Sequence, residues 1–186
     1  MSLRHALLGA LADRPRSGYE LLKHFEQSLA YAWPASHSQI YPELARLLDE
    51  SLIEQSASGP RGSKTYTLTA TGLAEVRRWL RETEPDRRVR SDASLRTFFL
   101  WLLEPDEARA QLERERAYWR GILDELEQIR AQPAGTQRKD LSYRLALEGG
   151  IRVIAARLEW VEWTLEQVQS GVWLSAPPDR EADLER

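Results

Sequence analysis

Hydrophobic residues in the first part of the chain recur every three or four positions in three successive segments. This spacing predicts three short amphipathic helices. Pro15 ends the first helix, because proline cannot continue it, and Ser17 with Glu20 three residues later predicts a capping box at the start of the second. The apolar positions are Leu3, Ala6, Leu7, Ala10 and Leu11, then Tyr19, Leu22, Phe25 and Leu29, then Ile40, Leu44, Leu47 and Leu48.

The beginning of the third helix is less regular than the other two. Either Ser36 or Ser38 is a suitable N-cap. Pro42 follows within a few residues, and proline is comfortable only in the first helical turn. We therefore expect this helix to start late or to have an irregular first turn.

After the third helix the period changes from helical to extended. Residues 52–55 and 65–68 predict two strands, and the turn-rich, basic residues 58–64 join them. Thr69 or Thr71 then caps a fourth helix with apolar positions Leu73, Val76, Trp79 and Leu80. The order helix, helix, helix, hairpin, helix is that of a winged helix-turn-helix.

The second half of the chain reads as helical almost throughout. A polar connector, residues 81–90, precedes a short helix that opens at Asp92 or Ser94, and Pro105 suits the first turn of the next helix. Two long helices then carry apolar residues at alternating spacings of four and three, around a turn at residues 133–136. The stripe of the first is Ala108, Leu112, Trp119, Ile122, Leu126 and Ile129, with Glu115 as one charged interruption. The stripe of the second is Leu147, Ile151, Ile154, Leu158, Val161, Leu165, Val168 and Val172.

These elements predict a mainly α protein with two domains. We expect a winged helix-turn-helix DNA-binding domain of three to four helices and a β-hairpin over residues 1–83. An α-helical dimerisation domain follows over residues 91–175, and residues 176–186 form a charged, disordered tail.

Composition and charge limit the classes of function. The 186 residues are 42% hydrophobic and 30% charged, the balance of a soluble globular protein, with a net charge of −3. The first 80 residues hold nine basic and eight acidic side chains. Any affinity for DNA must therefore come from a local patch and not from bulk charge.

Several chemistries find no support in the sequence. The absence of cysteine excludes disulfides, thiolate metal sites and cysteine nucleophiles, and it fits a cytoplasmic setting. The sequence also lacks metal-ligand spacing, a phosphate-binding glycine loop, a nucleophile elbow, a signal peptide and an apolar run of membrane-spanning length. We expect neither enzyme activity, nor a cofactor, nor a metal, nor a membrane partner.

Residues 40–47, with the sequence IYPELARL, resemble the signature helix of the phenolic-acid-decarboxylase repressor (PadR) family of bacterial regulators. Residues 2–9, 17–21 and 64–72 match in the same order. The second half resembles the longer subgroup, which carries a helical domain similar to that of virulence-gene activators. Members usually have Gly-Thr or Gly-Ser before the Ile-Tyr-Pro, whereas this chain has Ser38-Gln39, so base preference does not carry over.

The resemblance implies a homodimer that binds palindromic operators and, in some members, is released by a small aromatic ligand. The outer face of the third helix would then meet base edges in the major groove, and Gln39 can pair bidentately with adenine. The alternative is an ordinary solvated face. The candidate DNA-binding residues are Ser36, Ser38, Gln39, Tyr41, Pro42 and Arg46, with Arg61 and Lys64 on the hairpin and Tyr19, which either donates to a phosphate or packs in the core.

The second half supplies candidates for assembly and regulation. We expect the stripe on the last helix to be too long for one hairpin to cover, so that Leu147, Ile151, Ile154, Leu158, Val161, Leu165 and Val168 form a dimer interface. Gly149-Gly150 is costly within a helix and indicates either the close approach of another helix or a kink. Five aromatic residues either pack the core and interface or form the walls of an effector pocket that we expect between the DNA-binding half and the C-terminal helices: Phe98, Trp101, Trp119, Trp160 and Trp163.

The sequence is compatible with two functions that belong to different classes of protein. The first is a sequence-specific transcriptional regulator, a repressor acting on an inverted repeat, and the basic hairpin and polar helix face favour it. The second is a winged-helix module that binds other proteins and not DNA, which the acidic net charge favours.

Overall fold

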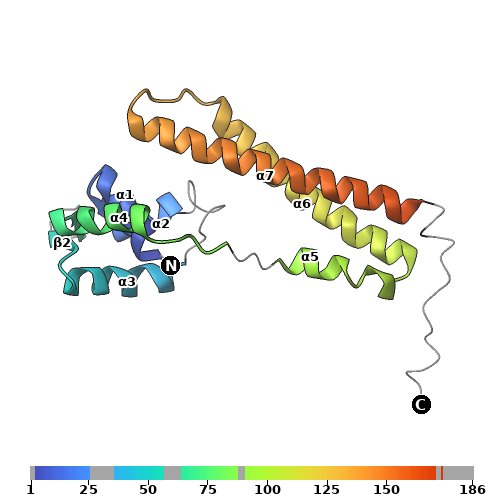
Figure 1. Cartoon of the computed structure of the whole chain (residues 1–186), viewed down its shortest axis with the longest axis horizontal. Coiled ribbons are helices and arrows are strands. Elements are labelled where there is room, and N and C mark those ends of the chain that lie inside the picture. Colours follow the sequence, from blue (N-terminus) through green and yellow to red (C-terminus); the bar gives the residue numbers. More distant parts are fainter. Residues whose placement is uncertain (1–2, 26–35, 57–63, 88–90, 171–172, 174–186) are drawn as a thin grey trace, which may run out of the picture. The chain divides into compact units, whose positions relative to one another are not determined.

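The computed structural model describes residues 3–25, 36–56, 64–87, 91–170 and 173. The chain divides into two compact units, residues 1–88 and 89–186. Figure 1 shows short helices with a small sheet in the first unit and two long helices in the second. Among the described residues, no helix is long and apolar enough to cross a bilayer.

The first unit is a winged helix-turn-helix, as predicted. Its elements follow in the order α1 (Leu3–Asp13), β1 (Arg16–Ser17), α2 (Gly18–His24), α3 (His37–Asp49), β2 (Ile53–Ser56), β3 (Thr65–Leu68) and α4 (Ala70–Glu82). The helices share one core, and its fully buried large side chains are Leu7, Leu8, Leu21, Phe25, Ile40, Leu44, Leu47 and Ile53. Leu29 lies outside the described residues.

The capping predictions are confirmed at the helices of this unit. Ser17 and Glu20 form the predicted capping box, because the Ser17 side chain accepts from the Glu20 N–H while the Glu20 carboxylate accepts from the Ser17 N–H at 2.7 Å. The Ser17 N–H and the Ser17 hydroxyl both donate to the Glu20 carboxylate, and these two hydrogen bonds hold the pKa of Glu20 below its ordinary value. Ser36 and Thr69, each one of two predicted alternatives, are the N-caps of α3 and α4.

Two features of the first unit differ from the sequence-based expectation. Helix α3 begins at His37, so Pro42 lies inside a continuous helix and the expected late start is wrong. Because proline has no N–H, the Ser38 carbonyl receives no helical hydrogen bond from it. The exposed first turns of α3 leave water free to reach that carbonyl.

The sheet also contains a third strand that the sequence did not reveal. The strand order is β1-β3-β2, all antiparallel, with Ser17 opposite Thr65 and Ser56 opposite the same Thr65 from the other side. The chain leaving α1 therefore pairs with the hairpin before it enters α2.

The second unit is an antiparallel helical hairpin with a short flanking segment. It contains α5 (Asp92–Thr97), the 3-10 helix η3 (Leu100–Leu102), α6 (Pro105–Ala131) and α7 (Arg138–Gln169). Ser91 is the N-cap of α5, one residue before the predicted alternatives, and Pro105 occupies the first turn of α6 as predicted. Val172 and the predicted tail lie outside the described residues.

Helix α6 covers the apolar stripe of α7 within a single chain. The side chains of Ile151, Ile154, Leu158, Val161, Leu165 and Val168 are at most 8% exposed. All of them except Leu158 pack in two clusters, with Leu112 of α6 in one and Leu126 of α6 in the other. Leu147 packs against the second cluster. The expectation that this stripe needs a second subunit to bury it is therefore wrong, because a 27-residue helix is long enough to cover it.

Candidate DNA-binding surface

Helix α3 has a buried face and a polar, exposed face. Ile40, Leu44 and Leu47 are buried against the rest of the unit. The opposite face exposes Ser38, Pro42 and Arg46, Gln39 and Tyr41 lie exposed on its flanks, and the exposed Ser36 is the N-cap of the helix. Six of the nine candidate DNA-binding residues thus lie together on the outside of one helix, mostly in its first two turns.

Gln39 has a structural role that the sequence analysis did not assign. Its side-chain oxygen Oε1 accepts hydrogen bonds from the Ser36 backbone N–H at 3.0 Å and from the Ser36 hydroxyl at 3.1 Å. An amide oxygen has two acceptor lone pairs, so both are in use. In this conformation Gln39 offers DNA only its Nε2 donor, and the bidentate pairing with adenine is not available.

Tyr41 is held in place by a glycine in the neighbouring helix. A Cβ added to Gly18 would lie 2.7 Å from Tyr41 Cε1 and 2.8 Å from the Tyr41 hydroxyl oxygen, too close for any real contact. The Tyr41 ring also lies 4.4 Å from the His37 ring, centroid to centroid. Gly18 therefore provides the space that lets α2 and α3 pack together with the Tyr41 ring between them.

The remaining candidates are exposed or lie outside the described residues. Tyr19 is 69% exposed, which excludes core packing and leaves its hydroxyl free to reach a partner. Lys64 is exposed at the base of the hairpin, immediately before β3, whereas Arg61 lies outside the described residues. Arg46 is exposed and makes a salt bridge with Glu43 at 3.1 Å, which offsets part of its positive charge.

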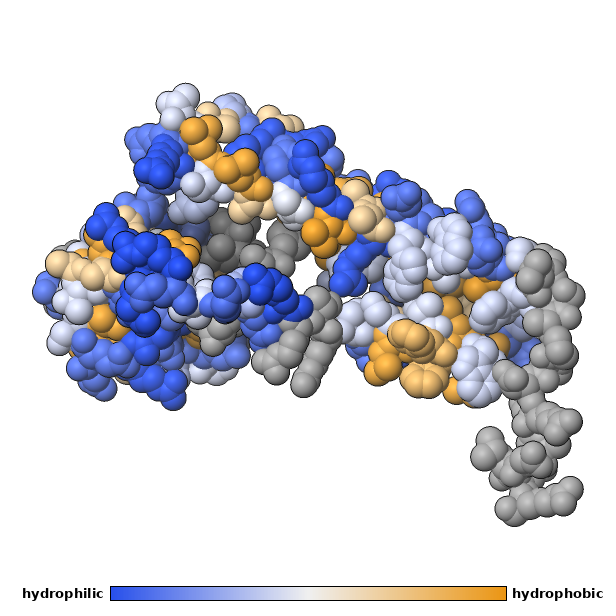
Figure 2. Space-filling model, viewed as in Figure 1, coloured by the Kyte–Doolittle hydropathy of each residue, from blue (hydrophilic) through white to orange (hydrophobic). Residues whose placement is uncertain are grey.

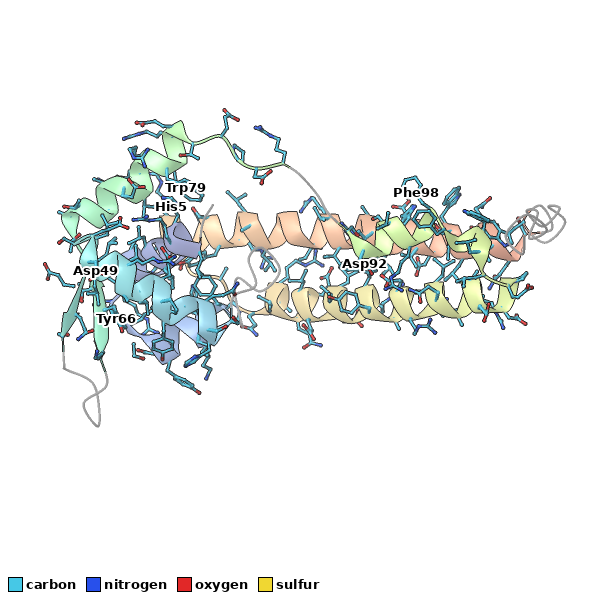
Figure 3. The ribbon with its side chains drawn as sticks, turned by 90° about the horizontal axis from the view of Figure 1, so that it is seen from below. His5, Asp49, Tyr66, Trp79, Asp92 and Phe98 are labelled. Atoms are coloured by element: carbon cyan, nitrogen blue, oxygen red, sulfur yellow. The ribbon has the colours of Figure 1, made fainter. Side chains whose placement is uncertain are left out.

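A cluster of His5, Glu75 and Trp79 joins the first and last helices of the unit. The His5 ring stacks on Trp79 with centroids 4.8 Å apart, and His5 Nε2 lies 3.0 Å from Glu75 Oε1 (Figure 3). Hydrogen bonds from Arg78 and His5 lower the pKa of Glu75 to about 2, well below its ordinary value. This cluster holds α4 against α1.

The five candidate effector-pocket residues do not form one enclosed site. Phe98, Trp101 and Trp163 are more than half exposed, whereas Trp119 and Trp160 are half-buried against the α6–α7 core. Sequence reasoning missed a cation beside these rings, since no local signal marks it. The Arg157 guanidinium lies 5.1 Å from the centroid of the Trp119 ring, and its Nη1 is 3.5 Å from the Ser91 hydroxyl.

The described residues contain no group of three histidine, cysteine, aspartate or glutamate side chains placed to hold a metal ion.

Comparisons with known proteins match both units. Residues 7–78 match the family described as "Transcriptional regulator PadR-like family", and residues 89–169 match "Virulence activator alpha C-term". A negative transcriptional regulator PadR of Bacillus subtilis is 30% identical over 176 residues, which cover 89% of this chain and 97% of that protein.

Two solved structures are similar over most of the chain. The crystal structure of Bacillus subtilis PadR in complex with operator DNA has a TM-score of 0.80 and 28% identity, and it covers 90% of this chain and 99% of the other. The same protein in complex with p-coumaric acid has a TM-score of 0.77 with the same identity and coverage.

Proposed function

Because this chain belongs to the PadR-like family of transcriptional regulators, we propose that it is a homodimeric repressor that binds an inverted-repeat operator through α3. The observation that carries the proposal is the exposed polar face at the start of α3, on a helix whose other face is fixed in the core. The Bacillus subtilis relative has been solved with operator DNA bound, which supports this assignment. We expect the protein to act in the cytoplasm.

We propose different tasks for the exposed side chains. The first turns of α3 enter the major groove, where Ser38 and the Nε2 of Gln39 reach base edges. Lys64 at the hairpin and the Tyr19 hydroxyl on α2 contact phosphates, which position the protein without reading sequence. Two such units related by a two-fold axis meet half-sites about 10 base pairs apart.

The proposal is tested by selecting bound sequences from a pool of random duplexes and then measuring affinity for the selected site at several salt concentrations. We expect an inverted repeat to be enriched. Lys64→Ala should weaken binding to all sequences alike and reduce the salt slope by about one. The matched control is Lys139→Ala, in the second unit, which should change neither quantity.

A pool that yields no enriched sequence would contradict the proposal and favour a protein-binding winged helix. An equal loss of affinity for Lys64→Ala and Lys139→Ala would remove the assignment of the hairpin base to phosphate contact.

For regulation, we propose that a planar aromatic acid binds beside Trp119 and Arg157. A guanidinium close to an aromatic face can pair with a carboxylate while the ring of the same molecule stacks. The relative solved with p-coumaric acid supports this class of ligand. Trp160 and the exposed Phe98, Trp101 and Trp163 stay candidates for the remaining contacts; the alternative is that all five rings only pack the protein.

The effector proposal is tested with p-coumaric acid as the probe, by tryptophan fluorescence and by release of operator DNA. We expect quenching and release for the wild type, and a loss of both for Arg157→Gln. Arg152→Gln is the control, because Arg152 is exposed on the same helix and pairs with Glu148. Quenching without release would show binding without regulation, and the absence of both responses would leave only the packing role.

A further inference from the structure

Arg157 on α7 is a half-buried cation with no carboxylate partner among the described residues. Every other arginine that is buried or half-buried in the described part of the chain pairs with a carboxylate: Arg4 with Glu50, Arg16 with Asp13, Arg130 with Glu127 and Arg144 with Glu148. A charge that is partly withdrawn from water is costly unless an opposite charge pairs with it. The position beside Arg157 therefore suits an anionic group that the described residues do not supply.

The aromatic ring beside Arg157 is itself held in place. The Trp119 Nε1–H donates to the Glu115 carboxylate at 3.2 Å, and both residues lie on α6. This hydrogen bond engages the edge of the indole ring, while the Arg157 guanidinium lies over the ring, 5.1 Å from its centroid. The ring and the guanidinium are therefore already in position before any ligand binds.

The Ser91 hydroxyl is the other polar group next to this guanidinium. Its oxygen accepts from the Ser94 N–H at 3.2 Å and from the Ser94 hydroxyl at 3.0 Å, which uses both acceptor sites of a hydroxyl oxygen. Arg157 Nη1 lies 3.5 Å from the same oxygen, beyond the usual range of an N–H···O hydrogen bond. No acceptor for the Ser91 hydroxyl proton is found in the described part of the chain. Two hydrogen-bond donors thus face each other, and neither makes a strong hydrogen bond to the other.

We propose that Ser91 is the second residue that holds the carboxylate of the effector, so that the acid bridges Arg157 on α7 and Ser91 at the start of α5. This rests on the proposed function, which places a planar aromatic acid beside Trp119 and Arg157. A carboxylate accepts at about 2.8 Å from a guanidinium nitrogen and about 2.6 Å from a hydroxyl oxygen, so one carboxylate can reach two donors that lie 3.5 Å apart. The contact uses the side-chain hydroxyl of Ser91 and not the backbone N–H groups of the short helix α5.

The bridge fixes the start of α5, which few other contacts hold. Ser91 is the N-cap of α5 and the first described residue after the connector from the DNA-binding unit. Helix α5 has no buried residue, and Figure 2 shows apolar side chains at its surface. A ligand shifts a conformational equilibrium only if it favours one state over the other. The state that the bound acid favours is the one in which the first turn of α5, where the connector enters, is fixed to α7.

Substitutions at residue 91 test the bridge without removing the N-cap of α5. Aspartate and asparagine are both good N-caps, so Ser91→Asp and its matched control Ser91→Asn differ chiefly in charge. The carboxylate of Ser91→Asp pairs with Arg157 in place of the ligand's carboxylate, whereas Ser91→Asn brings no charge. Each is made in the full chain with Arg157 intact and again together with Arg157→Gln. The probe is p-coumaric acid; its affinity is measured by tryptophan fluorescence, and amide hydrogen exchange is measured over residues 91–97.

We expect the dissociation constant of p-coumaric acid to be at least about tenfold higher for Ser91→Asp than for Ser91→Asn, the effect of one lost hydrogen bond to a charged group. In the wild type, bound acid should slow the exchange of residues 91–97 about tenfold. Ser91→Asp should show the same protection without the acid, and Arg157→Gln should abolish it. Equal affinities for Ser91→Asp and Ser91→Asn, or protection in Ser91→Asp that persists with Arg157→Gln, would overturn the proposal.

The outcome is separable from that of the proposed function. Binding of the acid that depends on residue 91, in a protein that enriches no DNA sequence, would support the bridge and remove the repressor assignment. Release of operator DNA by p-coumaric acid at equal concentrations from Ser91→Asp and Ser91→Asn would leave the function in place and overturn the bridge. A wild-type chain that does not bind p-coumaric acid would overturn the effector site and the bridge together.

Discussion

Replacing Gln39 by glutamate separates the two tasks of this side chain. In the structure, Gln39 Oε1 caps the start of α3 by accepting from the Ser36 N–H and hydroxyl, while Nε2 is the only group left for a base. Glutamate keeps the accepting oxygen and is the usual residue at this position of a capping box. It removes the donor and adds a negative charge on the face proposed to meet DNA.

The magnitudes follow from these contacts. One net hydrogen bond contributes about 0.5–1.5 kcal/mol, so the loss of the Nε2 donor in Gln39→Ala should weaken operator binding about fivefold. A carboxylate about 4 Å from a phosphate adds about 1 kcal/mol of repulsion in water, which gives a loss of about 30-fold for Gln39→Glu. A carboxylate in the first turn stabilises a helix by about 0.3–1 kcal/mol, so Gln39→Glu should melt at or above the wild-type temperature.

The assays are thermal melting by circular dichroism and operator affinity by fluorescence anisotropy at one fixed salt concentration. The two variants should rank in opposite orders, with Gln39→Ala the less stable protein and Gln39→Glu the weaker DNA binder. If Gln39→Glu melts below Gln39→Ala, the capping role is wrong. If Gln39→Glu binds the operator like the wild type, this face of α3 does not meet DNA.

Three further substitutions test the packing described above. Gly18→Ala should destabilise the first unit by about 1–3 kcal/mol, because its Cβ would overlap the Tyr41 ring. In a Gly18→Ala/Tyr41→Ala double variant the ring is gone, so the loss of stability should be smaller than the sum of the two single losses. Additive losses in melting experiments would refute the contact. Leu158→Ala should destabilise the second unit by about 2–5 kcal/mol in urea unfolding even where the chain is monomeric, since Leu158 is only 3% exposed in a single chain. A loss of dimer without a loss of stability would contradict this. The pKa of the Glu75 carboxyl is lowered to about 2, chiefly by Arg78, so its contribution to stability is present above pH 4.5 and lost as the pH falls through about 2. The difference in melting temperature between the wild type and Glu75→Gln should therefore shrink to zero over that interval. A difference that persists at pH 2 would show that the ion pair is not its origin.

The elements that the sequence predicted well are those set by neighbouring residues. The capping box of Ser17 and Glu20, the cap at Thr69 and the helical stripes of α6 and α7 all depend on residues within one or two helical turns of each other. The fold class follows from their order along the chain.

The features that the sequence did not predict depend on distant contacts. Strand β1 has only two residues, and it exists because β3 has a free edge on that side. The partner of the stripe on α7 is another helix of the same chain, which periodicity alone cannot distinguish from a second subunit. Arg157 lies beside Trp119 because α6 and α7 pair in register, and neither residue carries a local signal of that pairing.

The short strand β1 also limits how the proposed DNA-binding surface can be switched. It joins the hairpin to the N-cap of α2, and the Gly18–Tyr41 contact joins α2 to α3, so hairpin and recognition helix are fixed to each other. We therefore expect an effector to act by shifting this unit as one rigid body relative to its copy on the operator, and not by bending it. Ten base pairs of DNA rise about 34 Å, so a displacement of about 3.4 Å moves one recognition helix a full base pair out of step with the other.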